Sequence, residues 1–355
     1  MNLLYIALDA KNYALRICNE MAKQGHKITC MVLNKDFFDN EVKIDMEENI
    51  TVFELQQKEF YKADIFLKKY FEHIKNANVD AIFGVSILAT PIVDYLATLL
   101  KKPKYMMLLD VPIDLIEKEP ARKRDWGYHV PLLKRMNDVI FSTKIARDEF
   151  NRVYGKYYPN DNIVTYPTFL PEKFFKSGIK NDEGYIVSAC RLTPTKNCII
   201  IPYAMSKLKT VNTYVAIGKD GGQLKQIRHA CEKFGINFVH YDGITDERKF
   251  EIIKGASMMI YPQDSKYIGG LAPFEGMFVG IPVIVPNLKV LKDLYQGNCS
   301  YFDNGGIYSL ATQIAMLSLL KKEYLIDRLE ISAEFSKQEV SFEKAAKGIL
   351  NVLEE

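Results

Sequence analysis

Residues 258–285 read MMIYPQDSKYIGGLAPFEGMFVGIPVIV, and this stretch decides the fold class. It begins and ends with short apolar runs, Met258–Tyr261 and Val283–Val285, which are typical of buried strands. Between them, Pro273 suits the first turn of a helix and Gly280 suits its C-terminal end. The alternation of apolar strand, helix and apolar strand indicates a parallel sheet that helices cover on both faces.

The same rhythm runs through the rest of the chain. The other strand candidates are short apolar runs rich in β-branched residues: Leu3–Leu8, Ile28–Leu33, Ile50–Leu55, Ala81–Ser86, Tyr105–Asp110, Val139–Thr143, Ile163–Tyr166, Ile186–Cys190, Tyr214–Gly218 and Phe238–Tyr241. Between Pro167 and Asp182 the periodicity is lost, as in a linker. We expect an α/β protein with two doubly wound, Rossmann-like domains facing a cleft, residues 1–170 and 171–335, and a C-terminal helix in residues 336–355 that packs back on the first domain.

Length and composition agree with two domains of a globular protein. The chain has 355 residues, more than the roughly 250–300 that one core usually supports. Its 47 basic and 44 acidic residues are too balanced for a dedicated nucleic-acid-binding protein. The six cysteines form no CxxC pair, which favours a reduced, cytoplasmic protein, and no apolar run approaches the roughly 18 residues that a membrane span needs.

Two cations follow one of the predicted strands. Arg191 and Lys196 lie just after Ile186–Cys190, and ligands of parallel sheets bind outside the carboxyl ends of the strands. A forked guanidinium and a point-charge ammonium together suit a diphosphate. The alternative is a pair of solvated surface cations.

Glycine-rich loops follow two further strands. Gly218 opens the run GKDGG, and Gly269, Gly270 and Leu271 precede the predicted helix that contains Glu275. Glycines allow a ligand to approach the backbone, and the N–H groups at a helix N-terminus can meet phosphate oxygens. The Glu275 carboxylate can accept two hydrogen bonds from the vicinal hydroxyls of a ribose. The alternatives are a tight turn and a surface carboxylate that interacts with the helix dipole.

In order and spacing, these signals resemble a GT-B glycosyltransferase of the retaining family 4 (group 1) type over about residues 185–300. Arg191 and Lys196 match the family's Gly-Arg-Leu…Lys segment, which implies catalytic stabilisation of the donor diphosphate. Glu275 matches the second glutamate of the family's Glu-x7-Glu motif, which implies a ribose contact. The following Gly276–Val283 resembles the family's Ala-Met-Ala-x-Gly-x-Pro-Val.

The sequence departs from the family pattern in three of these segments. Cys190 stands where the family has the glycine before Arg191. Tyr267 aligns with the first glutamate of the motif, which contacts the donor sugar, and a phenol cannot supply the same charged contact. In the first domain, residues 102–110 resemble a family segment that ends in His-Asp, but only Asp110 is present. The resemblance implies that Asp110 touches the acceptor or donor sugar; a structural strand-end carboxylate is the alternative.

The resemblance implies transfer of a sugar from a UDP- or GDP-type nucleotide-diphosphate sugar to a lipid-linked or glycan acceptor, with retention. No Asp-x-Asp motif occurs and the five histidines are scattered, so we expect neither a catalytic metal nor another cofactor. One alternative is a nucleotide-sugar epimerase of the same fold, which would need acid and base residues. The other is a degenerate, non-catalytic GT-B binding protein, which Tyr267 favours.

A basic segment of the first domain surrounds the single tryptophan. Arg122, Lys123 and Arg124 lie beside Trp126, a combination that suits an anionic membrane surface or a lipid-phosphate acceptor. The alternative is a solvated loop in which Trp126 packs locally.

Overall fold

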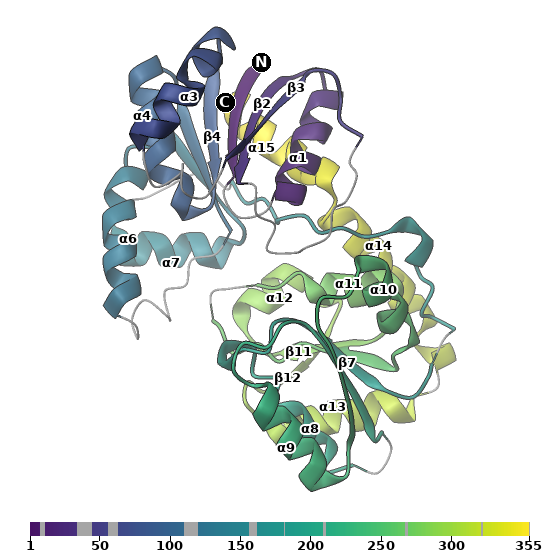
Figure 1. The fold of residues 1–355 in the computed structure, drawn as a ribbon. Coiled ribbons are helices and arrows are strands. Elements are labelled where there is room, and N and C mark those ends of the chain that lie inside the picture. Colours follow the sequence, from purple (N-terminus) through teal and green to yellow (C-terminus); the bar gives the residue numbers. More distant parts are fainter. Residues whose placement is uncertain are drawn as a thin grey trace. The chain divides into compact units, whose positions relative to one another are not determined.

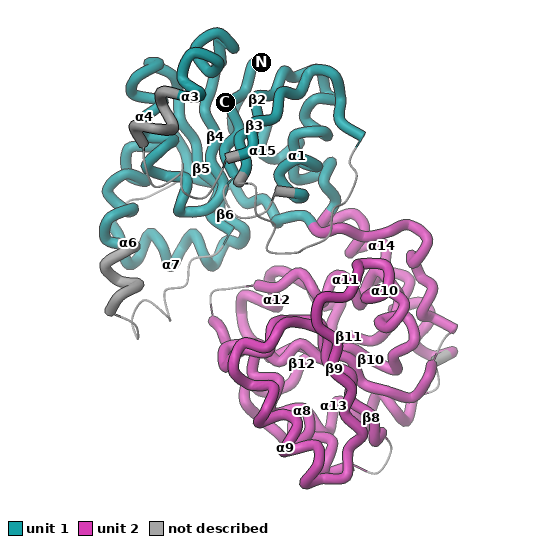
Figure 2. The backbone as a smooth tube through the Cα atoms, in the orientation of Figure 1, with its two compact units in different colours: residues 1–167, 341–355 teal, residues 168–340 magenta. Residues whose placement is uncertain are grey.

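The structure is a computed structural model that describes residues 1–7, 11–33, 45–55, 63–109, 120–155, 162–180, 182–208, 211–266, 269–320 and 322–354; for residues 63–68 and 120–126, and for 11, 33, 55 and 322, it describes the backbone alone. The chain forms two compact units (Figure 2). Unit 1 contains residues 1–167 and 341–355, and unit 2 contains residues 168–340.

Unit 1 is built on a parallel sheet with the strand order β3-β2-β1-β4-β5-β6. Its strands are β1 (Asn2–Ala7), β2 (Lys27–Leu33), β3 (Ile50–Leu55), β4 (Ala81–Val85), β5 (Lys104–Leu108) and β6 (Asp138–Phe141). Its helices are α1 (Lys11–Lys23), α3 (Ala63–Asn76), α4 (Thr90–Leu100), α6 (Pro120–Leu133), α7 (Lys144–Tyr154) and α15 (Phe342–Glu354), with the 3₁₀ turn η1 (Ile87–Ala89) before α4 (Figure 1).

The alternation of side chains along the central strands explains why helices cover both faces of this sheet. Tyr5 and Phe83 point into the cluster formed with α1 and α15. Gly84, one residue further, faces α4, because a Cβ at this position would meet Val93 at 2.6 Å. The C-terminal helix α15 lies beside α1 (Figure 1), and its Ile349 is fully buried in the same core.

Unit 2 repeats this architecture with the strand order β12-β11-β10-β7-β8-β9, again all parallel. Its strands are β7 (Ile186–Ala189), β8 (Thr213–Ile217), β9 (Asn237–Tyr241), β10 (Met258–Ile260), β11 (Val283–Pro286) and β12 (Ser300–Phe302). Its helices are α8 (Ile200–Met205), α9 (Leu224–Phe234), α10 (Asp246–Gly255), α11 (Ala272–Val279), α12 (Lys289–Tyr295), α13 (Ile307–Leu319) and α14 (Ile326–Glu339), and its 3₁₀ turns are η2 (Glu172–Phe174), η3 (Pro194–Lys196) and η4 (Lys322–Tyr324).

The structure corrects two details of the expected strand pattern. The predicted strand Ile163–Tyr166 is wrong, because this segment forms only one isolated bridge, between Ile163 and Phe141. Its Val164 is apolar for another reason, since it is buried in the core cluster that contains α15. The edge strand β12 was not predicted, because its three residues are too short to show a periodicity.

Candidate active site

In the sheet of unit 2, the order in which the chain adds strands reverses between β7 and β10. From β7 the chain adds β8 and β9 on one side, and it then returns to add β10, β11 and β12 on the other. Ligands of open α/β sheets bind outside the carboxyl ends of the strands at such a switch point. The loops that start here contain Arg191 and Lys196 after β7, and Gly269 and Gly270 after β10. The topology therefore brings the predicted cations and the glycine loop to neighbouring strand ends.

In the loop after β7, the side chain of Arg191 is exposed while the adjacent backbone is held by contacts with the core. Arg191 itself is exposed, whereas the next residue, Leu192, is fully buried in the core of unit 2. The backbone N–H of Leu192 donates to the carbonyl of Lys219 at 2.9 Å, which ties this loop to the loop after β8. The guanidinium of Arg191 can thus reach a ligand without any rearrangement of the core.

Gly218, at the end of β8, packs against the end of β7. A Cβ at this position would lie 2.2 Å from the carbonyl oxygen of Cys190, and the φ of Gly218 is 138°. Only glycine fits this contact and this backbone conformation. The structure therefore gives Gly218 a packing role, and a contact between its backbone and a phosphate stays a prediction.

Lys196 connects the loop after β7 with the loop after β10. Its Nζ donates to the hydroxyl of Tyr261 at 2.6 Å and to Oε1 of Gln263. It also lies 5.0 Å from the centroid of the Tyr261 ring, within the range of a cation–π interaction. Sequence reasoning found Lys196 but missed Tyr261 and Gln263. Their position directly after a strand at the switch point is the signal that could have found them.

The glycine loop approaches the side chains that hold Lys196. A Cβ on Gly270 would lie 2.1 Å from the hydroxyl oxygen of Tyr261, so no larger residue fits there without a shift. Tyr295 donates its hydroxyl proton to the carbonyl of Gly270 at 2.8 Å, and Nε2 of Gln263 lies 3.5 Å from the carbonyl of Gly269. The cation and the glycine loop therefore share one set of supporting side chains.

Helix α11 begins directly after this loop and carries a buried carboxylate. Leu271 is its N-cap residue, and Pro273 lies in its first turn. Glu275 is only 6% exposed, and its Oε1 lies 2.9 Å from Nζ of Lys249, which also lies 3.0 Å from Asp246. Glu275 is thus not a solvated surface carboxylate, and the ammonium of Lys249 compensates its burial.

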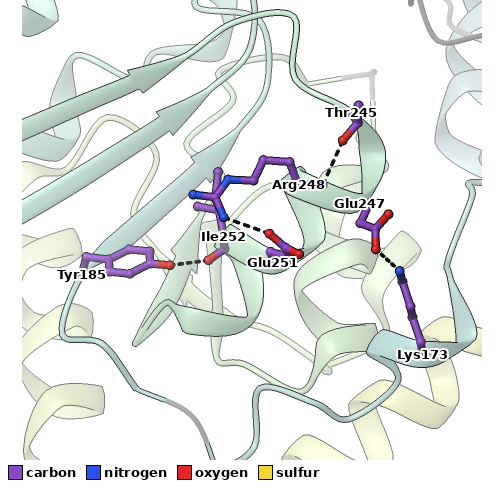
Figure 3. Close-up of polar contacts among 7 residues, drawn as sticks. All are labelled: Lys173, Tyr185, Thr245, Glu247, Arg248, Glu251 and Ile252. Atoms are coloured by element: carbon purple, nitrogen blue, oxygen red, sulfur yellow. Dashed lines mark hydrogen bonds and ion pairs between the residues drawn. The ribbon is translucent and has the colours of Figure 1, made fainter.

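Local contacts hold α10, the helix that carries Lys249. Figure 3 shows the polar contacts among Lys173, Tyr185, Thr245, Glu247, Arg248, Glu251 and Ile252. At its start, Oγ1 of Thr245 accepts from the backbone N–H of Arg248 at 3.2 Å, as an N-cap does. Near its end, the hydroxyl of Tyr185 donates to the carbonyl of Ile252 at 2.5 Å, and burial raises the pKa of Tyr185 to about 12. Both ends of α10 are therefore anchored within unit 2.

A pair of thiols flanks the cationic loop. Sγ of Cys190 lies 3.4 Å from Sγ of Cys198. The hydrogen bond from Cys198 lowers the pKa of Cys190, and the nearby charges of Lys196 and Arg191 act in the same direction against the effect of burial. The same hydrogen bond and burial raise the pKa of Cys198. Sequence reasoning treated these cysteines as unrelated, although they bracket one short loop that returns on itself.

Some of the predicted functional residues belong to parts of the chain other than the described site. Asp110 and Tyr267 lie outside the described residues. The basic segment around Trp126 belongs to helix α6 rather than to a loop, and its side chains are not described.

Among the described residues, no group of three or more His, Cys, Asp or Glu side chains lies close enough to hold a metal ion. None of the helices described combines the length and the apolar character that crossing a bilayer requires.

Comparisons with known proteins identify the fold. Residues 170–322 match the family model described as glycosyl transferases group 1. No curated protein shows significant sequence similarity to the chain. The fold is similar to that of HepE from Anabaena in complex with UDP, with a TM-score of 0.75, 14% identity and 100% of both chains covered.

Two other solved structures are similar over the full length. Sucrose-phosphate synthase from Thermosynechococcus elongatus has a TM-score of 0.76 and 12% identity, with 100% of this chain and 98% of that chain covered. A structure from E. coli, described as trehalose-6-phosphate bound with UDP-2-fluoro glucose, has a TM-score of 0.71 and 13% identity. The match covers 100% of this chain and 99% of that chain. The expected GT-B fold is thereby confirmed, and the group 1 domain makes the chain a transferase of glycosyl groups.

Proposed function

We propose that this transferase moves a sugar from a UDP-sugar to a lipid-linked or glycan acceptor with retention, as the resemblance to family 4 implies. The observation that carries the proposal is the meeting of Lys196 with the glycine loop at the switch point of unit 2. A cation and a set of backbone N–H groups from adjacent strand ends suit the two phosphates of one donor.

Each residue of the site has a proposed role. Arg191 and Lys196 stabilise the negative charge that develops on the diphosphate as it leaves, an effect that is usually a large part of catalysis. The N–H groups around Gly270 and Leu271 bind the phosphate oxygens, with no metal or further cofactor. Glu275 accepts hydrogen bonds from the ribose. Tyr267 and Asp110 are proposed to contact the sugars.

Different observations support the proposed donor and the proposed acceptor. The solved structures of similar fold include complexes with UDP, with UDP-glucose and with UDP-2-fluoro glucose, which favours UDP over GDP as the donor nucleotide. The basic segment Arg122–Trp126 favours an acceptor or surface that carries negative charge. A cytoplasmic protein that associates with membranes would meet both substrates.

A ligand screen tests the proposal. UDP-, GDP- and ADP-sugars are added to the wild-type chain, and the melting temperature is recorded. A UDP-sugar at 100 times its Kd should stabilise the fold by about 2.7 kcal/mol. Release of UDP from the donor without acceptor then distinguishes an enzyme from a binding protein. If no nucleotide sugar stabilises the chain and none is hydrolysed, the proposal is wrong.

A further inference from the structure

Three buried polar side chains contact Lys196 or the glycine loop. Tyr261 is 2% exposed, Gln263 is 1% exposed and Tyr295 is fully buried. The first two follow β10 at the switch point, and the third ends α12. Burial of a polar group is costly unless it is hydrogen-bonded, so the contacts of these side chains indicate why they are there.

The chemistry of the partners fixes the direction of each hydrogen bond. An ammonium only donates, so Gln263 presents Oε1 to Lys196 and turns Nε2 toward the carbonyl of Gly269, 3.5 Å away. The hydroxyl of Tyr261 accepts from Lys196 at 2.6 Å and donates to the same Oε1 at 2.5 Å. The amide of Gln263 is therefore used at both ends, by the cation on one side and by the glycine loop on the other.

The two tyrosines constrain the glycine loop in a similar way. The hydroxyl of Tyr295 donates to the carbonyl of Gly270 at 2.8 Å. The hydroxyl of Tyr261 occupies the space that a Cβ on Gly270 would need. Burial raises the pKa of both phenols well above its usual value, so both remain protonated donors at neutral pH.

We propose that Gln263, together with Tyr261, is a positioning residue that sets the distance between the Lys196 ammonium and the glycine loop, so that both meet one diphosphate. This inference rests on the proposed function. Gln263 acts through the two groups it holds and does not touch the substrate. A ligand that needs both groups, such as UDP, depends on this spacing, whereas UMP has one phosphate and depends on it less.

The test measures the affinities of UDP and UMP by calorimetry. Gln263→Met keeps the length of the side chain and removes its polar atoms. UDP affinity should fall by about tenfold, the scale of losing one charge-assisted hydrogen bond, whereas UMP affinity should change by less than about threefold. In a Lys196→Met background, adding Gln263→Met should cost little more, because residues that act through one another are not additive.

Two further variants keep the test decisive. Tyr261→Phe removes only a hydroxyl and should also lower the UDP-to-UMP affinity ratio, so it replaces Gln263→Met if that variant does not fold. Tyr301→Phe removes a hydroxyl from β12, at the edge of the same sheet, and should leave both affinities unchanged.

The outcomes separate this inference from the proposed function. If Lys196→Met weakens UDP binding but Gln263→Met and Tyr261→Phe do not, the positioning role is wrong and the proposed function stands. Equal losses for UDP and UMP, or additive losses in the double variant, also overturn the positioning role. If the wild type binds no nucleoside diphosphate, the proposed function and this inference both fail.

Discussion

The two units share one sheet topology but end their central strands with different chemistry. The switch point of unit 1 lies between β1 and β4, and that of unit 2 lies between β7 and β10. After β1, the strand of unit 1 that corresponds to β7, residues 8–12 read LDAKN, with one acidic and one basic residue. After β7, residues 190–197 read CRLTPTKN, with two cations. The two units thus place different residues at the corresponding position of one topology, and function depends on such residues rather than on the fold itself.

The backbone also differs at two other strand ends. Directly after β4, Ser86 has a φ of 70° and a ψ of 146°, a conformation that favours glycine. At the end of β8, the residue with a positive φ is Gly218. The end of β4 therefore carries a strained serine, whereas the end of β8 carries the residue type that tolerates such a backbone.

Removing either cation should show that the loop after β7 is needed for transfer of the sugar. Arg191→Ala and Lys196→Met should each reduce kcat by about 10²–10³-fold, the usual cost of losing one group that stabilises developing charge. Lys219→Ala is the matched control, because Lys219 is exposed in the loop after the neighbouring strand β8. Steady-state kinetics that show an equal loss for Lys219→Ala would remove the special role of the switch point.

Substitution of Gly218 should reveal the packing between the ends of β7 and β8. Gly218→Ala forces a Cβ against the carbonyl of Cys190 and should destabilise the chain by about 3 kcal/mol, since strain and overpacking add. Gly222→Ala is the control, because Gly222 has a φ of 104° but open space around it. Equal denaturation midpoints for the two variants would show that the contact with Cys190 contributes nothing.

Neutralising the basic segment of unit 1 should separate its role from that of unit 2. Replacement of Arg122, Lys123 and Arg124 by glutamine should weaken binding to anionic liposomes by about 10²-fold, since each cation contributes about 1 kcal/mol. UDP affinity should not change. The difference should shrink at 1 M salt, where the Debye length is about 3 Å, while Trp126→Ala should weaken binding at any salt concentration. A wild-type chain that does not co-sediment with such liposomes at low salt would rule out the membrane role.

Ser86→Gly should have the smallest effect and the opposite sign. Glycine relieves the strain at φ 70° at some cost in chain entropy, so the free energy of unfolding should rise by about 1 kcal/mol. Chemical denaturation measures this change, and UDP affinity serves as the control that should stay constant. A destabilised variant would mean that the Ser86 side chain makes a contribution larger than the strain.

Structural features that depend on local sequence patterns could be predicted from the sequence. The helix bounded by Pro273 and Gly280 is confirmed, because both ends are encoded within a few residues. The contact between Lys196 and Gln263 could not be predicted, since it joins positions 67 residues apart and depends on side-chain geometry. The prediction of a strand at Ile163–Tyr166 is wrong for the same reason. Val164 and Tyr166 pack in the core cluster that contains helix α15, which is far away in the sequence.

A crystal structure of the chain with UDP would show directly where the donor diphosphate binds. We expect the diphosphate at the carboxyl ends of β7 and β10, with oxygens about 3 Å from Nζ of Lys196 and from backbone N–H groups next to Gly270, as charge-assisted hydrogen bonds require. The ribose should lie within hydrogen-bond distance of Glu275. UDP bound at another place, with Lys196 still bound to Tyr261 and Gln263 and not to a phosphate, would contradict this placement.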